Sequence, residues 1–252
     1  MRRVAPVLLA LAMAGCGLRG PRLALPPGAT VESLLAGLEA RRAAVRSMRA
    51  RVQIRAGLAQ VWAREAVVVE RPRAVRVDVL SPLGLALALG TDGDRLWVFP
   101  PQEGLRYEGP ATPENLARFF GTAVTSEDLV DVMLGLPPRR VPAATPRSER
   151  LRGGMLRVVV PFADGEQLLD FGGPPAHVRR AEELRRGSLV MRIDFDDYRD
   201  GFPWRVDLHG ADGVAASVRY IQVERNVALD PAVFQPPPAP RVLPLEAIEV
   251  RR

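Results

Sequence analysis

Apolar and polar residues alternate with a period of two over much of the chain, which is the pattern of half-buried β-strands. Val52 and Ile54 alternate with arginine and glutamine, and the segment 75–79 has valine at every second position. The same alternation returns in the second half of the chain. There it predicts a meander of strands at 156–160, 168–171, 178–184, 189–195, 204–208 and 214–223.

Three segments have helical spacing instead. The first covers 31–49, where leucine, valine and methionine recur on one helical face after Thr30, a suitable N-cap. A second helix is predicted to begin at Thr112, because a cap, a first-turn proline and an acidic residue follow one another there. A third helix begins at Ser126 and ends at Gly135.

The remaining pattern completes an α+β fold. Asp92-Gly93 supplies a hairpin turn, and further strands are predicted at 61–70, 85–89 and 96–99. With about ten or eleven strands, we expect one domain over residues 30–252, a single strongly curved antiparallel sheet or incomplete β-barrel. The helices should plug its concave side and leave an apolar cavity beneath them. The Pro-rich C-terminal segment should run extended over the surface.

The N-terminus has the pattern of an exported, lipidated protein. Arg2 and Arg3 precede an apolar run that is too short to span a bilayer, so residues 1–15 are predicted to be a cleaved signal peptide. Small residues precede Cys16, the only cysteine, and resemble the lipobox of bacterial lipoproteins, in which this cysteine is acylated. The segment 16–29 is rich in proline and glycine and indicates a linker. The alternative is an ordinary secretory signal followed by a free thiol.

Composition and charge favour a binding protein over an enzyme. The formal net charge is +6, but every basic residue is arginine and the arginines are scattered, so nucleic acid is not an expected partner. His177 and His209 are the only histidines, and neither has metal-ligand spacing around it. Asp194, Asp196 and Asp197 could form a carboxylate cluster, although the polar face of a strand explains them better. We expect no catalytic residue, no metal and no cofactor.

Two short motifs resemble the LolB family, whose members are outer-membrane lipoproteins that accept other lipoproteins from the periplasmic carrier LolA and insert them into the outer membrane. The first motif is the turn Ser-Pro-Leu-Gly at 81–84, and the second is Val-Met-Leu-Gly-Leu-Pro at 132–137. An aromatic-Ala-Arg element at 62–64 also matches, and the likeness covers most of residues 45–138. Ser81 replaces the asparagine of the family pattern, and both residue types form turns.

The resemblance implies an incomplete β-barrel with a helical lid and an apolar cavity that takes acyl chains without a cofactor. Leu83 matches the family's protruding leucine, while Pro82 would stiffen the turn and Gly84 would permit its reversal. Burial of one leucine contributes about 1.5–3 kcal/mol, enough to bias a loop toward lipid. The alternative places Leu83 back on the core. Expected cavity residues, which an ordinary core would also explain, are Val77, Val79, Leu87, Leu89, Phe119, Phe120, Leu129 and Met133.

These predictions converge on a monomeric, non-catalytic outer-membrane lipoprotein, anchored at the periplasmic face by acyl chains on Cys16. Its expected partners are acylated lipoproteins, a LolA-like periplasmic carrier, and membrane lipid contacted by the Leu83 loop. One alternative is a periplasmic sensor of lipid or lipoprotein, similar to the RseB-type regulators. Another is a structural envelope lipoprotein whose core is fully packed.

Overall fold

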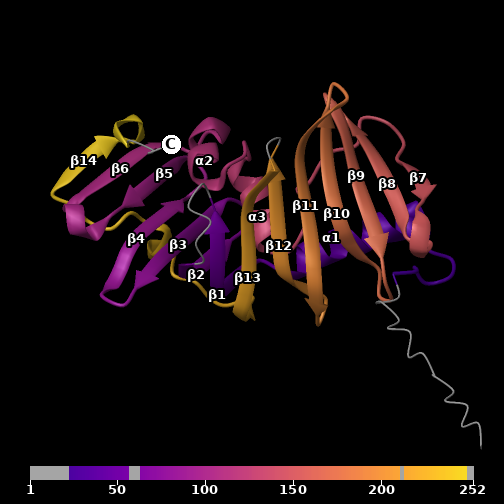
Figure 1. Ribbon diagram of the computed structural model, residues 1–252, viewed down its shortest axis with the longest axis horizontal. Coiled ribbons are helices and arrows are strands. Elements are labelled where there is room, and N and C mark those ends of the chain that lie inside the picture. The colour runs from indigo at the N-terminus through magenta and orange to yellow at the C-terminus, as the bar shows by residue number, and fades with distance from the viewer. Residues whose placement is uncertain (1–22, 57–62, 211–212, 249–252) are drawn as a thin grey trace, which may run out of the picture.

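The computed structural model describes residues 23–56, 63–210 and 213–248 (Figure 1). The predicted signal peptide, Cys16 and Trp62 lie outside these residues. Within the described ranges, no helix is long and apolar enough to cross a membrane.

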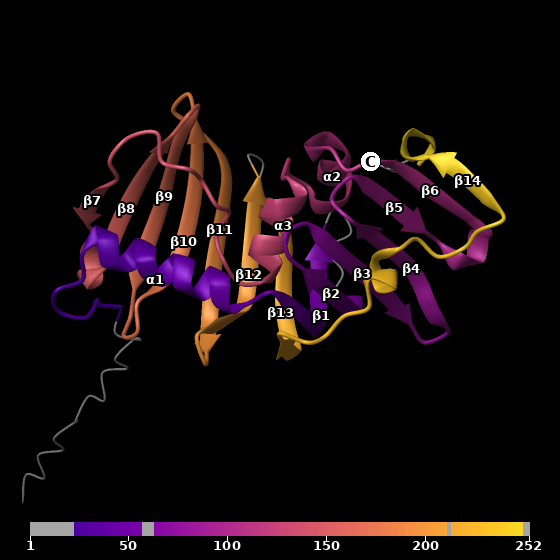
Figure 2. The same ribbon diagram turned by 180° about the vertical axis from the view of Figure 1, so that it is seen from behind.

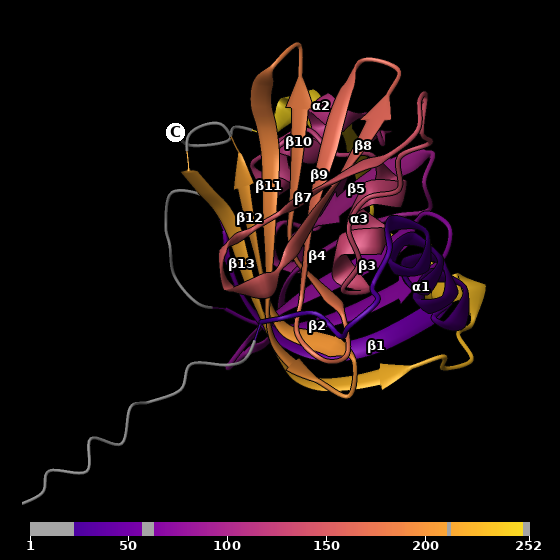
Figure 3. The same cartoon turned by 90° about the vertical axis from the view of Figure 1, so that its right-hand side faces the viewer.

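All strands of the described residues belong to one sheet. They are β1 (Ser47–Ala56), β2 (Ala63–Glu70), β3 (Ala74–Ser81), β4 (Gly84–Thr91), β5 (Arg95–Phe99), β6 (Leu105–Pro110), β7 (Arg147–Arg150), β8 (Leu156–Phe162), β9 (Gly165–Gly172), β10 (His177–Arg185), β11 (Ser188–Arg199), β12 (Phe202–Gly210), β13 (Gly213–Arg225) and β14 (Arg241–Pro244). Their order across the sheet is β14-β6-β5-β4-β3-β2-β1-β13-β12-β11-β10-β9-β8-β7. The sheet is open, because β14 and β7 each have one free edge, and it curves strongly (Figure 3).

The predicted α+β class and incomplete barrel are confirmed, with 14 strands in the described part of the chain. The apolar alternation predicts neither β6 nor the two short strands β7 and β14, whose side chains are all exposed. Neighbouring strands are antiparallel, except that β14 pairs with β6 in parallel. The sheet is therefore larger than the sequence pattern alone indicates.

Strand β1 joins the two halves of the sheet. It pairs with β2 on one side and with β13 on the other, so the N-terminal hairpins and the C-terminal meander are continuous. Its alternate residues Met48, Ala50 and Val52 are buried, as the period of two predicts. Residues from both halves consequently share one hydrophobic core.

The first helix, α1 (Val31–Ala44), lies across the strands from β8 to β12 (Figure 2). Thr30 and Ser33 form a capping box, with hydrogen bonds of 3.2 and 3.0 Å between each side chain and the other's backbone N–H. The predicted end at residue 49 is wrong, because Val45 is already extended and Met48 belongs to β1. Met48 faces inward from β1, three residues after Val45, and this spacing imitates one more turn of the helix.

Two short helices follow β6 as predicted, α2 (Pro113–Phe120) and α3 (Ser126–Met133). A threonine before each helix accepts a hydrogen bond from a backbone N–H of the first turn, at 3.3 and 3.1 Å. After α3, Gly135 has a φ of 75°, and a side chain at this position would collide with Pro203 of β12. Helix α3 packs on β2 and β3, which places it inside the curve of the sheet.

The C-terminal segment is an integral part of the structure. The indole N–H of Trp97 on β5 donates a hydrogen bond of 3.0 Å to the carbonyl of Phe234. The chain then adds β14 to the edge of the sheet, and Arg118 of α2 donates to the carbonyl of Leu245 at 2.9 Å. Leu245 is fully buried. The extended conformation agrees with the prediction, but the segment also fastens α2 to the sheet edge.

Candidate functional site

Strands β3 and β4 bring four of the predicted cavity residues together on one face of the sheet. In the antiparallel register, Val77 lies opposite Leu89 and Val79 lies opposite Leu87. Val77 is buried, whereas the other three keep part of their surface exposed. Val77 belongs to the same core as the residues of α3, so this face is the concave one.

The helices supply the other four predicted residues. Leu129 and Met133 of α3 are buried, while Phe119 and Phe120 at the end of α2 pack against the core but stay half-buried. The predicted set therefore forms a buried apolar base and a half-buried apolar rim. Five hollows in the described part of the chain have other linings, so contact between this set and lipid stays a prediction.

One carboxyl group interrupts the apolar concave face. Glu65 is in phase with Val67 and Val69 along β2, and it lies opposite Val52 on β1 and Val79 on β3. It is 8% exposed and has no hydrogen-bond or ion-pair partner among the described residues. Burial raises its pKa to about 7. Glu65 is not among the residues predicted for the site, although an acid at an inward position of an alternating strand is a visible signal.

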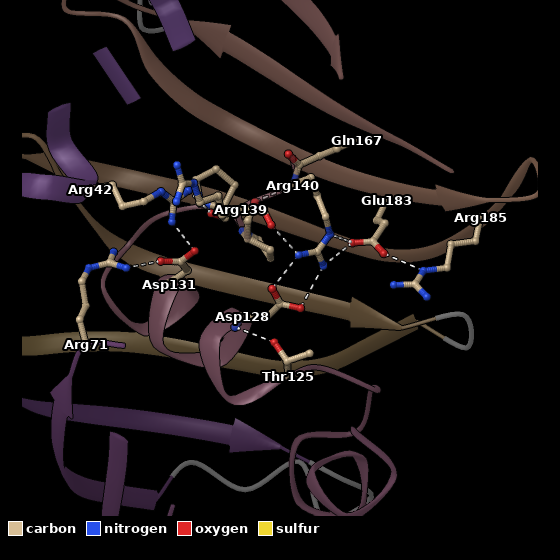
Figure 4. Close-up of polar contacts among 12 residues, drawn as sticks. Arg42, Arg71, Thr125, Asp128, Asp131, Arg139, Arg140, Gln167, Glu183 and Arg185 are labelled. Atoms are coloured by element: carbon tan, nitrogen blue, oxygen red, sulfur yellow. Dashed lines mark hydrogen bonds and ion pairs between the residues drawn. The ribbon is translucent and has the colours of Figure 1, made fainter. Parts of the chain in front are cut away.

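Ion pairs that are largely buried hold α3 in place (Figure 4). Asp131 of α3 binds Arg42 of α1, and its other carboxylate oxygen accepts a hydrogen bond of 2.7 Å from Arg71, in the turn between β2 and β3. Arg42 also donates to the carbonyl of Pro137 at 3.0 Å. One carboxylate thus connects α3 with α1 and with the sheet.

A second carboxylate on the same helix connects α3 with the other half of the sheet. Arg140 binds both oxygens of Asp128, at 2.7 and 2.9 Å, and reaches Glu183 of β10 at 2.7 Å (Figure 4). Beside it, the Gln167 amide of β9 donates to the carbonyl of Pro138 at 2.8 Å. The sequence analysis predicts none of these residues. The available signal is that Asp131 interrupts the apolar second half of this helix, one turn after Asp128.

The turn between β3 and β4 presents Leu83 to solvent, and this residue is 93% exposed. The backbone N–H of Leu83 donates to the Ser81 hydroxyl at 3.2 Å, and that hydroxyl donates to the carbonyl of Gly84 at 3.0 Å. Gly84 has a φ of 110°, which a residue with a side chain rarely adopts. The exposure excludes the alternative in which Leu83 folds back on the core, while its membrane role stays a prediction.

A hollow of about 940 Å³ lies beside this turn. Pro82, Leu80 and Ile221 contribute apolar surface to it, and the last two are 49% and 47% exposed. Arg51 and Arg64 line the same hollow and outnumber its one carboxyl group, that of Glu65. Apolar groups next to guanidinium groups can contact acyl chains and anionic lipid headgroups together.

The polar face of β11 is occupied by ion pairs. Asp194 accepts contacts from Arg180, Arg192 and His209 at 2.7, 3.1 and 3.0 Å. Within the residues that the structure describes, no group of three or more His, Cys, Asp or Glu side chains is arranged to hold a metal ion. Asp194 is therefore part of a network of charged side chains on this strand.

Comparison with known proteins identifies a shared fold. No protein-family model and no curated protein sequence matches the chain. A LolA superfamily protein from Nitrosomonas europaea is similar in structure, with a TM-score of 0.56 and 16% identity over 82% of this chain and 98% of that one. An outer membrane lipoprotein-sorting protein domain from Vibrio parahaemolyticus gives 0.52 and 12%, over 80% and 94%. A DUF1329 family protein from Desulfovibrio piger gives 0.53 and 13%, over 80% and 94%.

We expect Asp131→Asn to lower the free energy of unfolding by about 3–5 kcal/mol, because it removes the buried carboxylate that Arg42 and Arg71 share and leaves Arg42 only the exposed Glu39. The matched control is Asp94→Asn, which removes an exposed ion pair with Arg73 and should cost less than about 1 kcal/mol. Denaturant unfolding of the two variants measures both changes. Equal losses of unfolding free energy in the two variants would contradict the conclusion that the buried ion pairs of Asp131 hold α3 in place.

We expect Glu65 to make stability fall as the pH rises. Its pKa is about 7 in the folded protein and near 4.5 without burial, so the folded state binds the proton more tightly. This contribution is complete below about pH 4.5 and is lost as the pH rises through 7. Glu65→Gln should nearly match the natural protein at pH 5 and exceed its free energy of unfolding by about 1–3 kcal/mol at pH 8.

Urea unfolding at the two pH values measures this difference. The control is Glu246→Gln, at an exposed position, which should leave the pH dependence unchanged. A Glu65→Gln variant with the pH dependence of the natural protein would contradict the inward placement of this carboxyl group.

Proposed function

We propose that this chain, which has the fold of LolA superfamily proteins, is a non-catalytic, LolB-like acceptor of lipoproteins. In this proposal it is an outer-membrane lipoprotein that receives acylated proteins from a LolA-like carrier at the periplasmic face and inserts them into the membrane. The main support is the combination of a half-buried apolar rim on the concave face with a single leucine, Leu83, held out in water.

The acyl chains of a client would enter between α2 and the face of β3 and β4. Leu87, Leu89 and Phe119 have apolar surface that the fold leaves partly exposed, so a chain that covers it removes water from both partners. Each methylene group transferred contributes about 0.8 kcal/mol. Helix α3, fixed by its two carboxylates, would form the floor of this site.

The membrane contact would use the turn at Leu83 and the hollow beside it. One leucine can bias a loop toward lipid by about 1.5–3 kcal/mol, and each arginine near an anionic surface adds about 1 kcal/mol. The lasting anchor would be the acyl chains on Cys16. Delivery then needs no nucleotide, provided that the bilayer binds the client's acyl chains more tightly than the concave face does.

Uptake of a client can be tested by placing a charge on the concave rim. Leu87→Arg should weaken the binding of a fluorescent triacylated lipopeptide at least about tenfold, because an unpaired charge in an apolar site costs several kcal/mol. Ala66→Arg is the matched control, because Ala66 lies between the inward-facing Glu65 and Val67 on β2 and therefore on the opposite face of the sheet. It pairs with Asp78 of β3, and the variant should bind the lipopeptide as the natural protein does. Normal uptake by Leu87→Arg would exclude the concave face as the acyl site.

Delivery can be separated from uptake at the turn. Leu83→Glu should bind the lipopeptide normally but transfer it to liposomes at least about tenfold more slowly, because a carboxylate at the tip opposes entry into lipid. The control is Val141→Glu, which replaces an apolar residue that is 78% exposed in a different loop. Unimpaired transfer by Leu83→Glu would favour the sensor or the structural lipoprotein over the acceptor.

A further inference from the structure

A second, smaller hollow of about 150 Å³ lies at the C-terminal end of α1 and shares no residue with the predicted acyl site. Its apolar lining comes from Leu38, Leu136, Val178 and Phe202. This space is large enough for a headgroup and a few carbon atoms, and it is too small for the acyl chains of a lipoprotein. Any ligand here would differ from the client of the proposed function.

A buried imidazole with an unsatisfied nitrogen lines this hollow. His177 is 7% exposed and is stacked on Tyr198, with 4.2 Å between ring centroids and 7° between ring planes. Tyr198 is itself fixed, because its hydroxyl donates a hydrogen bond of 2.6 Å to the carbonyl of Val178. Nδ1 of His177 is buried and has no hydrogen-bond partner among the residues that the structure describes. A buried polar atom left unpaired costs about 1–3 kcal/mol, so a ligand toward which the ring turns this nitrogen gains affinity.

Two guanidinium groups line the same hollow without a carboxylate partner in the described part of the chain. Arg41 donates to the carbonyl of Ala176 at 2.8 Å, and Arg225 lies 5.9 Å from the ring centroid of Phe202. The hollow has one acidic residue, Asp200, which is exposed. The arginines therefore leave an excess of positive charge around a small, partly apolar space.

We propose that this hollow binds an oxyanion headgroup, a carboxylate or a phosphate on a short alkyl chain, with Arg41, Arg225 and His177 as its polar contacts. Guanidinium groups form strong, charge-assisted hydrogen bonds to both kinds of oxyanion. Burial, together with Arg41 and Arg179, lowers the pKa of His177 to about 4. The ring is consequently neutral at pH 7, and its Nδ1–H tautomer can donate to the anion. The apolar lining would take the first carbon atoms of the chain.

The two histidines allow a direct test by NMR, because His177 reports on the hollow and His209, on another face, serves as an internal reference. The probe is hexanoate, titrated into the full chain carrying Cys16→Ser. We expect saturable shifts of the His177 ring resonances and no comparable shift of those of His209. Hexyl phosphate, titrated in parallel, shows which of the two headgroups binds more tightly. Hexanol, which lacks the charge, should bind at least about tenfold more weakly than either.

Variants identify the contacts by calorimetry. Arg225→Gln, at an exposed position, should weaken hexanoate binding at least about tenfold, whereas Arg49→Gln, an exposed arginine on β1 outside the hollow, should not. His177→Phe keeps the stacking on Tyr198 and should weaken hexanoate binding as well. The proposal is overturned if His177 shows no saturable shift, if hexanol binds as tightly as hexanoate, or if Arg225→Gln and Arg49→Gln behave alike.

Discussion

The position of α3 against the sheet depends on two carboxylates that are removed from water. An open, curved sheet cannot fill its own concave side, and a helix of 8 residues has little stability of its own. Asp128 and Asp131 are each matched by guanidinium groups from other segments of the chain. Buried ion pairs add little net stability, because desolvation offsets their attraction, but any arrangement that leaves one partner unpaired is strongly disfavoured. The charges therefore determine where the helix lies.

The same ion pairs divide the concave side into a part that they hold together and a part, next to α2, that they do not reach. Arg42 and Arg140 connect α3 with α1 and β10, so these two helices are fixed to each other and to this half of the sheet. Helix α2 has no ion pair among the described residues, and the two phenylalanines at its end remain half-buried. Under the proposed function, an acyl chain that needs more room would enter where no buried ion pair has to break. That place is next to α2 and β4, where the half-buried apolar rim lies.

More features of the fold than of the candidate site can be predicted from the sequence. Inward-facing side chains impose a period of two on strands such as β1, β3 and β11, so these strands can be recognised from the sequence, as can the helix caps Thr30 and Thr112. The short edge strands β7 and β14 bury no side chain, and their positions leave no apolar pattern. Likewise, turn residues predict the reversal at 81–84, but the direction of the Leu83 side chain depends on the packing around it. Asp131 and Arg42 are 89 residues apart, so only the tertiary structure pairs them.

Because every Lys or Arg position of this chain is arginine, its basic side chains cannot lose their charge when they are buried. A guanidinium group stays protonated, so each one removed from water needs an anion or carbonyl oxygens. Arg157 meets this need with two contacts to Asp170, at 2.7 and 2.9 Å, and Arg42 meets it with Asp131. Among the described residues, Arg41, the residue before Arg42, is partly buried and binds only a backbone carbonyl. Arg118 of α2 likewise binds only backbone carbonyls, at 2.9 and 2.8 Å, so a missing acid alone does not indicate an anion. Arg41 differs because it lines a hollow together with Arg225 and His177, and this shared placement is the reason to expect an anion from outside the protein.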